Sequence, residues 1–478
     1  MPRFKVADYK IFHANGKNFV FLIDDKAIFE MDDQIGDIIA EWEKVSDFND
    51  QEFLASLPDD LEDRDELFNS LLCKHLIVPI SKGGPKKKYH EKGCSAHLSV
   101  QTLVLHLTDF CNLGCVYCYH DQWESPATQK KRMPFHVGKK AVDFALEHSN
   151  NYGRVLLVFF GGEPLLELDL IKSIADYAVR EGERRGIQVE FSMTTNGTLL
   201  TQEAIDVICR CNMGITVSID GFPEVQNRNR PFRDGRPSYD KVVWNVRKLL
   251  EVTKRPVVAR VTVTRNPENL QRILEHLLEL GFTEVGFSPV TSGASGYKLN
   301  KEEMTTLLAQ FKVLSKRFLQ SIERREFFGF SNIIDLVVTL HQGELMDYPC
   351  GAGLSLFAVN PEGRLFVCQR FINQADFCVG DISNGFDLEK LLEFRKQVHI
   401  GQKKECVDCW VRTICTGGCY HEACLREGDF AKPNIHYCEW IKDWTKVGLE
   451  TYVRIAADSP ASLDELSLMR GYSPMRNL

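Results

Sequence analysis

Three cysteines stand close together early in the second hundred residues of a 478-residue chain. They are Cys111, Cys115 and Cys118, a CxxxCxxC pattern that offers three thiolates within eight residues. A [4Fe–4S] cluster has four irons, and cysteine thiolates normally hold all of them. Three ligands would leave one iron open to a small molecule. The spacing alone also fits a zinc site that lacks one ligand, or three buried thiols.

A second, larger group of cysteines lies in the last third of the chain. Pairs with CxxC spacing are common in structural zinc sites, so zinc is one interpretation. Seven cysteines suit two iron–sulfur clusters better than one tetrahedral ion. The seven are Cys350, Cys368, Cys406, Cys409, Cys415, Cys419 and Cys438.

The first cysteine group follows the first of six apolar strands that alternate with helical stretches. One such stretch, residues 165–184, repeats its apolar residues on one face until Gly186 stops it. This alternation predicts an α/β fold of parallel βαβ units. Six units are too few for a closed eight-stranded barrel, so we expect a partial (β/α)6 TIM-like barrel with its chemistry at the C-terminal ends of the strands. The expected strands are 101–107, 155–160, 189–193, 215–219, 257–263 and 285–290.

Polar motifs end the second, third and fourth of these strands. The second strand ends in GGEP, which by itself fits a turn followed by a helix start. The third ends in TTNG and the fourth in SIDG, and their polar residues could instead cap a helix or form a turn. Two arginines follow the fourth strand, and each could form a solvated ion pair at the surface. The candidate residues are Gly161, Gly162, Glu163, Pro164, Asn196, Ser218, Asp220, Arg228 and Arg230.

Together with these strand ends, the CxxxCxxC loop resembles the signature of the radical S-adenosylmethionine (SAM) enzymes, CxxxCxΦC, with Tyr117 as the aromatic residue Φ. The resemblance implies a [4Fe–4S] cluster whose open iron binds the amino and carboxylate groups of SAM. Tyr117 would lie near the adenine. Glu163 and the GGEP backbone would contact the SAM amino group. Asn196, Ser218, Asp220 and Arg230 would lie near the ribose and carboxylate.

The seven later cysteines, with Gly363 ahead of Cys368, resemble the SPASM domain of peptide-modifying radical SAM enzymes. The resemblance implies two auxiliary [4Fe–4S] clusters, and so three clusters in all. It assigns Cys350, Cys368 and Cys419 to auxiliary cluster I, and Cys406, Cys409, Cys415 and Cys438 to auxiliary cluster II. Cluster I then lacks a fourth thiolate. Either Cys378 fills this place or the iron is open to substrate, and we expect the open site.

Residues 1–90 contain none of these cysteines and show a different pattern. Strands are expected at 5–12 and 18–23, and helices at 31–43 and 51–57, which together make a small α+β module. The run SKGGPKKKYHEK that starts at Ser81 is typical of a linker. Helices are expected from residue 300 to about 340, and little regular periodicity follows between 350 and 438. The expected domains are 1–90, a barrel at 91–340, a SPASM domain at 341–455 and a tail at 456–478.

The sequence around the last cysteines, CWVRTICTGGCYHEA from Cys409 and NIHYCEWI from Asn434, most resembles the family of the quinohemoprotein amine dehydrogenase maturation protein and its thioether-forming relatives. This resemblance implies Cys-to-Asp/Glu thioether crosslinks in a small polypeptide that carries a leader. Residues 1–90 would be a winged-helix-like module that binds the leader as an added strand. A flavodoxin- or ferredoxin-type donor would supply electrons.

Two alternatives remain open, and a third is disfavoured. Sulfatase-type maturases carry an acidic residue after the cysteine that matches Cys368, and Gln369 stands here, which argues against formylglycine formation. Carbon–carbon or carbon–oxygen crosslinks would use the same cofactors, and a zinc-stabilised scaffold would use none of them. We interpret His421 and Glu422 as hydrogen-bonding residues of the cluster loop rather than as acid and base.

The composition excludes some classes of protein and favours others. The formal net charge of −8 removes the positive field on which non-specific nucleic-acid binding depends. The sequence shows no signal-peptide pattern and no run of about 18 apolar residues, so we expect a cytoplasmic protein without a membrane span. Sixteen cysteines are too many for structural disulfides in a reducing compartment, which favours metal clusters.

Overall fold

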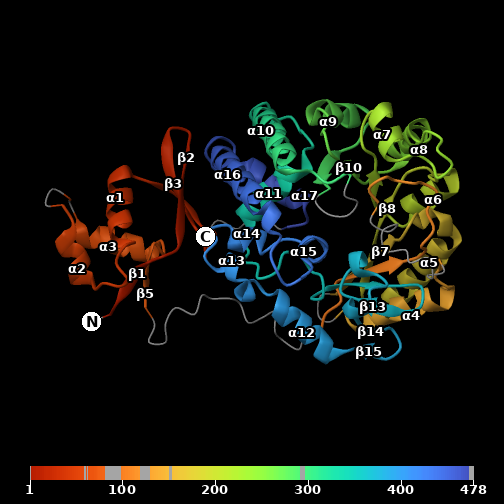
Figure 1. The fold of residues 1–478 in the computed structure, drawn as a ribbon, viewed down its shortest axis with the longest axis horizontal. Helices are drawn as coiled ribbons and strands as arrows, with labels where there is room; N and C mark the ends of the chain where they lie inside the picture. Colours follow the sequence, from red (N-terminus) through yellow and green to blue (C-terminus); the bar gives the residue numbers. More distant parts are fainter. Residues whose placement is uncertain are drawn as a thin grey trace.

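The computed structural model describes residues 2–58, 61, 63–80, 98–118, 130–149, 153–290 and 296–472. A smaller N-terminal part lies beside a larger α/β body (Figure 1). The larger body is built on a sheet in which six parallel strands are hydrogen-bonded in chain order. These strands are β6 (Thr102–His106), β7 (Arg154–Phe160), β8 (Gln188–Thr195), β9 (Gly214–Ser218), β10 (Val257–Val263) and β11 (Glu284–Pro289).

Helices follow these strands and surround them (Figure 1). Alternate strand residues, such as Val155, Leu157 and Phe159 of β7, are buried against the helices in the main core. The residues between them face the interior of a partial barrel. The partial barrel is confirmed, and the six expected strands differ from the observed ones by a few residues at most. The helices are α4 (Phe135–Glu147), α5 (Leu168–Arg185), α6 (Gln202–Arg210), α7 (Pro223–Asn229), α8 (Tyr239–Val252) and α9 (Leu270–Glu279).

The end of α5 agrees with the sequence. Gly186 follows the helix with φ +67°, the left-handed conformation that ends helices and favours glycine. The start of α5 differs from the expected start at residue 165, because a 3-10 turn, η4 (Pro164–Glu167), precedes the helix.

Residues 350–438, where the sequence shows little periodicity, extend the sheet. Strand β12 (Leu356–Val359) pairs in parallel with β6, and β13 (Arg364–Phe366), β14 (Cys378–Asp381) and β15 (Gly385–Phe386) follow antiparallel. Helix α12 (Leu388–Val398) comes next. The periodicity is weak because these strands are two to four residues long, too short to produce a periodic pattern, and they are stabilised by pairing at the edge of the barrel sheet.

Four helices pack together beside β11 and close that edge of the sheet. They are α10 (Lys301–Glu323), α11 (Ser331–Gln342), α16 (Ile435–Asp458) and α17 (Pro460–Met469). Beyond α17, Arg470 donates to both carboxylate oxygens of Glu284 in β11, at 2.8 and 2.7 Å. The chain therefore continues as helix across the expected boundary at residue 455, and Leu463 and Leu466 of the expected tail are buried.

The N-terminal part combines two small sheets with three helices. Its elements are β1 (Phe4–Val6), β2 (Tyr9–Ala14), β3 (Lys17–Leu22), β4 (Ile28–Met31), α1 (Asp33–Trp42), α2 (Asp50–Ser56), α3 (Arg64–Cys73) and β5 (Ile77–Pro79). Strand β1 pairs with β5, and β2, β3 and β4 form a meander. The single strand expected at 5–12 is wrong, because the chain leaves one sheet after Val6 and enters the other at Tyr9.

This N-terminal part is joined to the larger body by shared packing. Phe12 and Phe21 of the β2–β3 hairpin belong to the main core. The buried Arg412 donates to Asp8 and Asp24 at 2.7 and 2.5 Å. The expected linker from Ser81 and the boundary at residue 90 lie outside the described residues.

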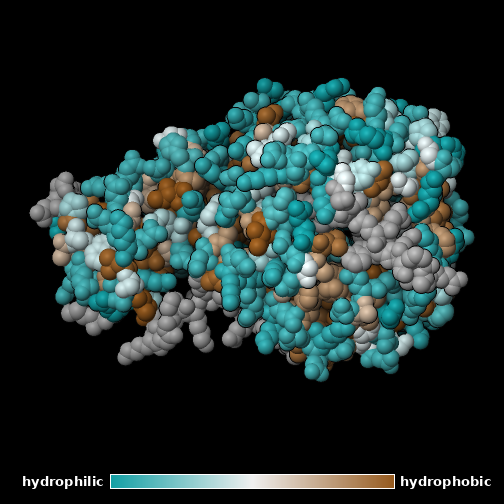
Figure 2. Space-filling model, in the orientation of Figure 1, coloured by the Kyte–Doolittle hydropathy of each residue, from teal (hydrophilic) through white to brown (hydrophobic). Residues whose placement is uncertain are grey.

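The surface in Figure 2 is mainly hydrophilic, with hydrophobic residues scattered among polar ones. No helix among the described residues is both long and apolar enough to cross a membrane.

Candidate active site

The cluster loop, residues 111–118, follows β6 at its C-terminal end and is held by a second chain segment. Gly114 N donates to Pro231 O at 2.8 Å, and Val116 N donates to Asn229 O at 3.0 Å. Asn229 is the last residue of the short helix α7, which follows β9, and Pro231 lies just beyond it. The loop is therefore held between the end of one strand and the segment that follows another.

The three thiols of the loop lie together in a partly buried place. Burial, together with the neighbouring Cys118 and Cys111, raises the pKa of Cys115 to about 12. Burial also raises the pKa of Cys111. Such thiols stay protonated at neutral pH unless a metal stabilises the thiolate. The structure thus brings together the predicted cluster ligands in a setting that favours metal binding.

The two glycines of the GGEP motif pack directly on the backbone that leads into the cluster loop. Gly162 N donates to Thr108 O and Glu163 N donates to Phe110 O, both at 2.8 Å. A Cβ atom on Gly161 would lie 2.5 Å from Thr108 O, and one on Gly162 would lie 2.2 Å from Phe110 O. Any side chain would break this contact. The motif is therefore more than a turn, although Pro164 does begin η4 as the simpler interpretation held.

Glu163 lies buried at the centre of a hydrogen-bond network. Its carboxylate accepts from Thr195 Oγ1 at 2.7 Å, from Asn196 N at 2.8 Å and from Leu165 N at 3.1 Å. Burial outweighs these bonds and raises the pKa of Glu163 to about 7. A cationic group beside it would favour the charged carboxylate.

Asn196 reaches the cluster loop directly. Its Nδ2 donates to Asn112 Oδ1 at 2.9 Å and lies 3.8 Å from Cys111 Sγ. Thr201, and not Asn196, caps α6, but the alternative of a turn is confirmed, because Asn196 Oδ1 accepts from Thr198 N at 3.0 Å. Ser218 is the last residue of β9 and pairs in register with Arg260 of β10.

Asp220 connects three of the predicted residues. It is fully buried, and it accepts from Tyr117 Oη at 2.7 Å and from Arg230 Nε at 3.2 Å. The Arg230 guanidinium lies 5.5 Å from the centre of the Tyr117 ring. Arg228, by contrast, forms the solvated surface pair of the alternative reading, with Glu268 at 3.2 Å.

Several residues at this site carried no signal in the sequence. Asn112 and Asn229 hydrogen-bond to predicted residues, and Arg233 Nε donates to Cys111 O at 2.7 Å. Asn112 lies within CxxxCxxC, and Asn229 and Arg233 lie one and three residues from Arg230; only this nearness in sequence could have suggested them.

The later cysteines surround a cavity of about 650 Å³, the cysteine cavity. Six of the seven line it: Cys350, Cys406, Cys409, Cys415, Cys419 and Cys438. Burial, together with the nearby Cys419 and Cys350, raises the pKa of Cys368 to about 12. Burial, together with Cys415, Cys438 and Cys409, likewise raises the pKa of Cys406 to about 12. The thiols therefore lie in the two groups that the resemblance assigns to the two auxiliary clusters.

A buried lysine between these groups fits an anionic occupant. Lys403 is 2% exposed, and its Nζ has no hydrogen-bond partner among the described residues. Burial lowers its pKa, while Cys406, Cys415, Cys350 and Cys419 act in the opposite direction. An ammonium without a partner is costly in such a place. Thiolate-ligated iron–sulfur clusters would supply the missing acceptors and negative charge.

A zinc ion needs four ligands in a tight tetrahedron. The six cysteines lie around the walls of the cysteine cavity. Among the described residues, in the cluster loop as well as here, no three Cys, His, Asp or Glu side chains lie close enough together to hold one metal ion.

Cys378 does not line the cysteine cavity, and in β14 it pairs in register with Phe366 of β13, two residues before Cys368. Its thiol lies 3.5 Å from Gly380 O and packs against a small core that includes Val104, Ala358 and Phe366. These residues belong to the interior face of β6 and the strands beside it.

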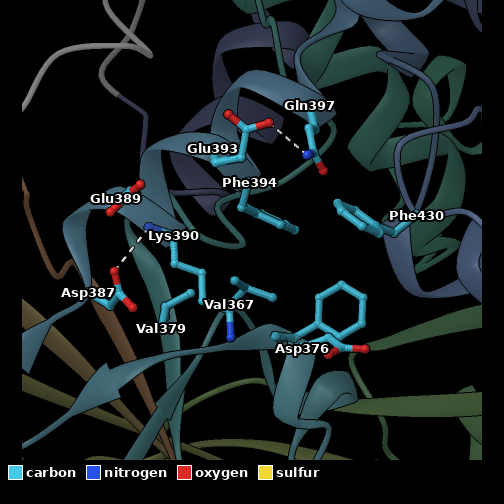
Figure 3. Close-up of a pocket in the computed structure, with 11 residues that line it drawn as sticks. Val367, Asp376, Val379, Asp387, Glu389, Lys390, Glu393, Phe394, Gln397 and Phe430 are labelled. Carbon is cyan, nitrogen blue, oxygen red and sulfur yellow. Dashed lines mark hydrogen bonds between the residues drawn. The ribbon is translucent and has the colours of Figure 1, made fainter.

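A second cavity, of about 410 Å³, lies between α12 and the β13–β14 region. Figure 3 shows Phe394 and Phe430 pointing into it, with Asp376, Glu389 and Glu393 around it. None of the predicted site residues lines this cavity.

Comparisons with known proteins agree with this geometry. Residues 105–280 match the family model of the Radical SAM superfamily. The chain is 25% identical to the serine-type anaerobic sulfatase-maturating enzyme of Klebsiella aerogenes over 65% of this chain and 76% of that protein. It is 23% identical to the cysteine-type enzyme of Clostridium perfringens over 72% and 95%. An uncharacterized protein of Methanocaldococcus jannaschii is 26% identical over 55% and 90%.

Solved structures show the same fold. Native anSMEcpe with bound AdoMet and Cp18Cys peptide matches with a TM-score of 0.64 at 20% identity, covering 75% of this chain and 99% of that one. Streptococcus suis SuiB bound to precursor peptide SuiA matches with a TM-score of 0.51 at 14% identity, covering 92% and 100%. The chain therefore carries a radical SAM domain over residues 105–280 and is homologous to the anaerobic sulfatase-maturating enzymes.

Proposed function

We propose that this radical SAM enzyme modifies a small polypeptide by forming intrapeptide thioether crosslinks between Cys and carbon atoms of Asp or Glu. The observation that carries the proposal is the position of the cysteine cavity. Its walls include the auxiliary cysteines and also Arg260 and Ser288 from the interior of the barrel. A peptide segment could thus lie between the cluster loop and the auxiliary cysteines.

The residues of the barrel would hold SAM beside the cluster loop. Cys111, Cys115 and Cys118 would ligate a [4Fe–4S] cluster, and the auxiliary cysteines two more. Cluster and SAM together supply a carbon radical that abstracts hydrogen from an unactivated carbon. Glu163 would accept from the SAM ammonium group, and Tyr117, Asn196, Ser218, Asp220 and Arg230 would surround the remainder of the cofactor. Enclosure by the barrel keeps water from the reacting carbon.

The open site expected on auxiliary cluster I fits this reaction. A substrate cysteine would be held there as the thiolate. The carbon radical would form the C–S bond with this sulfur, and the cluster would accept the electron that is left over. The position of Cys378 in the barrel interior supports the view that it is not the fourth ligand.

The N-terminal part is proposed to bind the leader of the polypeptide. Strand β4 is an edge strand of the meander β2–β3–β4, and an extended leader could add to a free sheet edge by backbone hydrogen bonds. A flavodoxin- or ferredoxin-type protein is the proposed electron donor.

The test uses anaerobically reconstituted enzyme, SAM, a reductant and a candidate small polypeptide encoded beside this protein. Thioether formation should remove two hydrogen atoms and one alkylatable thiol for each link. Loss of hydrogen with every thiol still free would instead support carbon–carbon or carbon–oxygen crosslinks.

A second candidate function is formylglycine formation, because the curated relatives include serine-type and cysteine-type sulfatase-maturating enzymes. An aldehyde in the product, detected with a hydrazine reagent, would establish it and overturn the thioether proposal. Gln369, in place of the expected acidic residue, is the feature that disfavours it.

A further inference from the structure

The cysteine cavity contains one cation that the described protein does not pair. Four cationic side chains line it. Three have carboxylate partners: Arg370 with Glu422 at 3.5 Å, Arg412 with Asp8 at 2.7 Å, and Lys442 with Glu439 at 2.9 Å.

The fourth is Arg260, which has no carboxylate within ion-pair distance among the described residues. The cavity has two carboxylates in its wall. Glu422 is engaged by Arg370, and Glu405 lies outside ion-pair distance of Arg260. A positive charge therefore faces the cavity without a direct ion pair among the described residues, and only Asp335, beyond ion-pair distance, acts on it as an opposite charge.

The strand and its neighbour hold Arg260 in a fixed position. Its neighbours Ala259 and Val261 are buried in the main core, so Arg260 projects to the interior face of β10. Its Nη2 donates to Ser288 Oγ on β11 at 3.0 Å. The side chain is nevertheless exposed to the cavity. Such a guanidinium is preorganised, because part of its rotamer entropy is already lost before a ligand arrives.

The electrostatics of the cavity favour an anion. Desolvation lowers the pKa of Arg260, and the neighbouring Arg370 lowers it further. Arginine remains charged in proteins despite such effects. Two guanidinium groups near each other in an enclosed space repel, and a bound anion relieves the repulsion.

We propose that Arg260 binds a carboxylate of the polypeptide substrate in the cysteine cavity, with Arg370 as the neighbouring cation. The planar guanidinium matches a carboxylate with two parallel hydrogen bonds. Apolar wall residues, among them Ile414 and Ile441, would cover the carbon stem that carries it. The inference rests on the proposed function and names its substrate group. The carboxylate could belong to an Asp or Glu side chain or to the C-terminus of the peptide.

The experiment measures binding of three small probes to the reconstituted full-length enzyme by anaerobic titration calorimetry. N-acetyl-aspartate N-methylamide presents a side-chain carboxylate, N-acetyl-alanine presents a terminal carboxylate, and N-acetyl-asparagine N-methylamide is the neutral match. We expect at least one carboxylate probe to bind the wild type roughly tenfold more tightly than the neutral probe, since a hydrogen bond to a charged group contributes about that factor. The better of the two carboxylates identifies the source.

The variants decide which residue is responsible. Arg260→Gln should remove the preference for the carboxylate, and Arg260→Lys should restore part of it. Ser288→Ala, which removes the acceptor that orients the guanidinium, should reduce the preference even if Arg260→Gln fails to fold. The matched control is Arg255→Gln, because Arg255 precedes the same strand and binds Asn212 O at 2.6 Å outside the cavity. Equal binding of all three probes, no measurable binding of either carboxylate, or an unchanged preference in Arg260→Gln and Ser288→Ala would overturn the proposal.

A further arm repeats the titration with saturating SAM. If SAM abolishes the preference, Arg260 binds the carboxylate of SAM and the substrate assignment is wrong. The readout is binding and does not need turnover. Loss of the preference therefore refutes the carboxylate site alone, whereas a product without thioether links refutes the proposed function.

Discussion

The cluster loop and the auxiliary cysteines are held in place by different means. Regular strands and backbone hydrogen bonds surround the cluster loop, and Gly161 and Gly162 allow the close approach. Among the auxiliary cysteines, Cys406 and Cys415 lie on two four-residue helices, α13 (Lys404–Val407) and α14 (Arg412–Cys415). Cys438 lies in the first turn of α16, and the others lie outside helices and strands. Thr416 in that region has a left-handed φ of +49°.

The unpaired ammonium of Lys403 marks the second region as incomplete without its occupant. The buried charge of Asp220, in contrast, is satisfied by four protein donors. The barrel site is thus organised by the protein itself, whereas we propose that the auxiliary region depends on clusters held by its cysteines.

The largest effect expected is loss of catalysis on removal of the cluster loop ligands. Replacing Cys111, Cys115 and Cys118 together with Ala should abolish production of 5′-deoxyadenosine, measured by chromatography. Iron content should fall from about twelve to about eight atoms per chain, because two of three [4Fe–4S] clusters remain. Cys209→Ala, which removes an exposed thiol on α6, serves as the control. Continued SAM cleavage in the triple variant would falsify the assignment.

The next effect concerns the buried Glu163. Glu163→Gln should weaken SAM binding by roughly tenfold to a hundredfold, because a charged hydrogen bond becomes a neutral one. Its pKa of about 7 adds a pH dependence: the carboxylate form binds the SAM ammonium, so wild-type affinity should rise as pH increases through 7 and then level off. Equilibrium dialysis between about pH 6 and about pH 8 covers this titration.

The Gln variant should show no such rise, whereas Glu181→Gln on the outer face of α5 should behave as the wild type. A rise that persists in Glu163→Gln assigns the titration to another group.

A stability measurement tests the difference between the two regions. Lys403→Met should stabilise the iron-free protein by about 1–3 kcal/mol, because it removes an unpaired buried charge. In the reconstituted protein the same change should destabilise, since the lysine is then paired with an anionic cluster. Calorimetric Tm values should shift in opposite directions in the two forms.

Lys404→Met, at the exposed neighbouring position, should leave both Tm values nearly unchanged. Shifts of the same sign in the iron-free and reconstituted forms of Lys403→Met would contradict the argument.

A smaller effect is expected in the N-terminal part. Leu22 N donates to Ala27 O, and hydrogen-bonded pairs alternate along an antiparallel ladder, so the N–H of Glu30 points to the free edge of β4. Glu30→Pro should weaken binding of the leader-bearing polypeptide about fivefold, the effect of one backbone hydrogen bond. Fluorescence anisotropy of a labelled polypeptide measures this affinity.

Glu30→Ala is the matched control, because it loses the ion pair with Lys17 but keeps the N–H. Equal affinities for the two variants would show that the leader does not use this edge.

The smallest effect is expected for Cys378. Because its thiol packs against the apolar residues of the barrel interior, Cys378→Ala should leave the iron content of the reconstituted enzyme unchanged. Loss of iron from auxiliary cluster I in this variant would make Cys378 the fourth ligand.

The sequence by itself determined the parallel barrel strands and most of the barrel site. Each strand of a parallel sheet is covered on both faces, so its sequence is a short, nearly continuous apolar run. Each motif lies at or just after the C-terminal end of a strand. The cluster loop, GGEP and Asp220 could be found for this reason, since local spacing places them at one edge of the sheet.

Tertiary structure decided what depends on contacts between distant segments. Strands β12 to β15 form because β6 offers an unpaired edge, and the β2–β3 hairpin joins the main core through Phe12 and Phe21. Arg260 carried no motif, and it became a candidate residue only where β10, β11 and the auxiliary cysteines meet around one cavity. Such contacts depend on which surfaces fold together, and the order of residues in any one segment does not encode them.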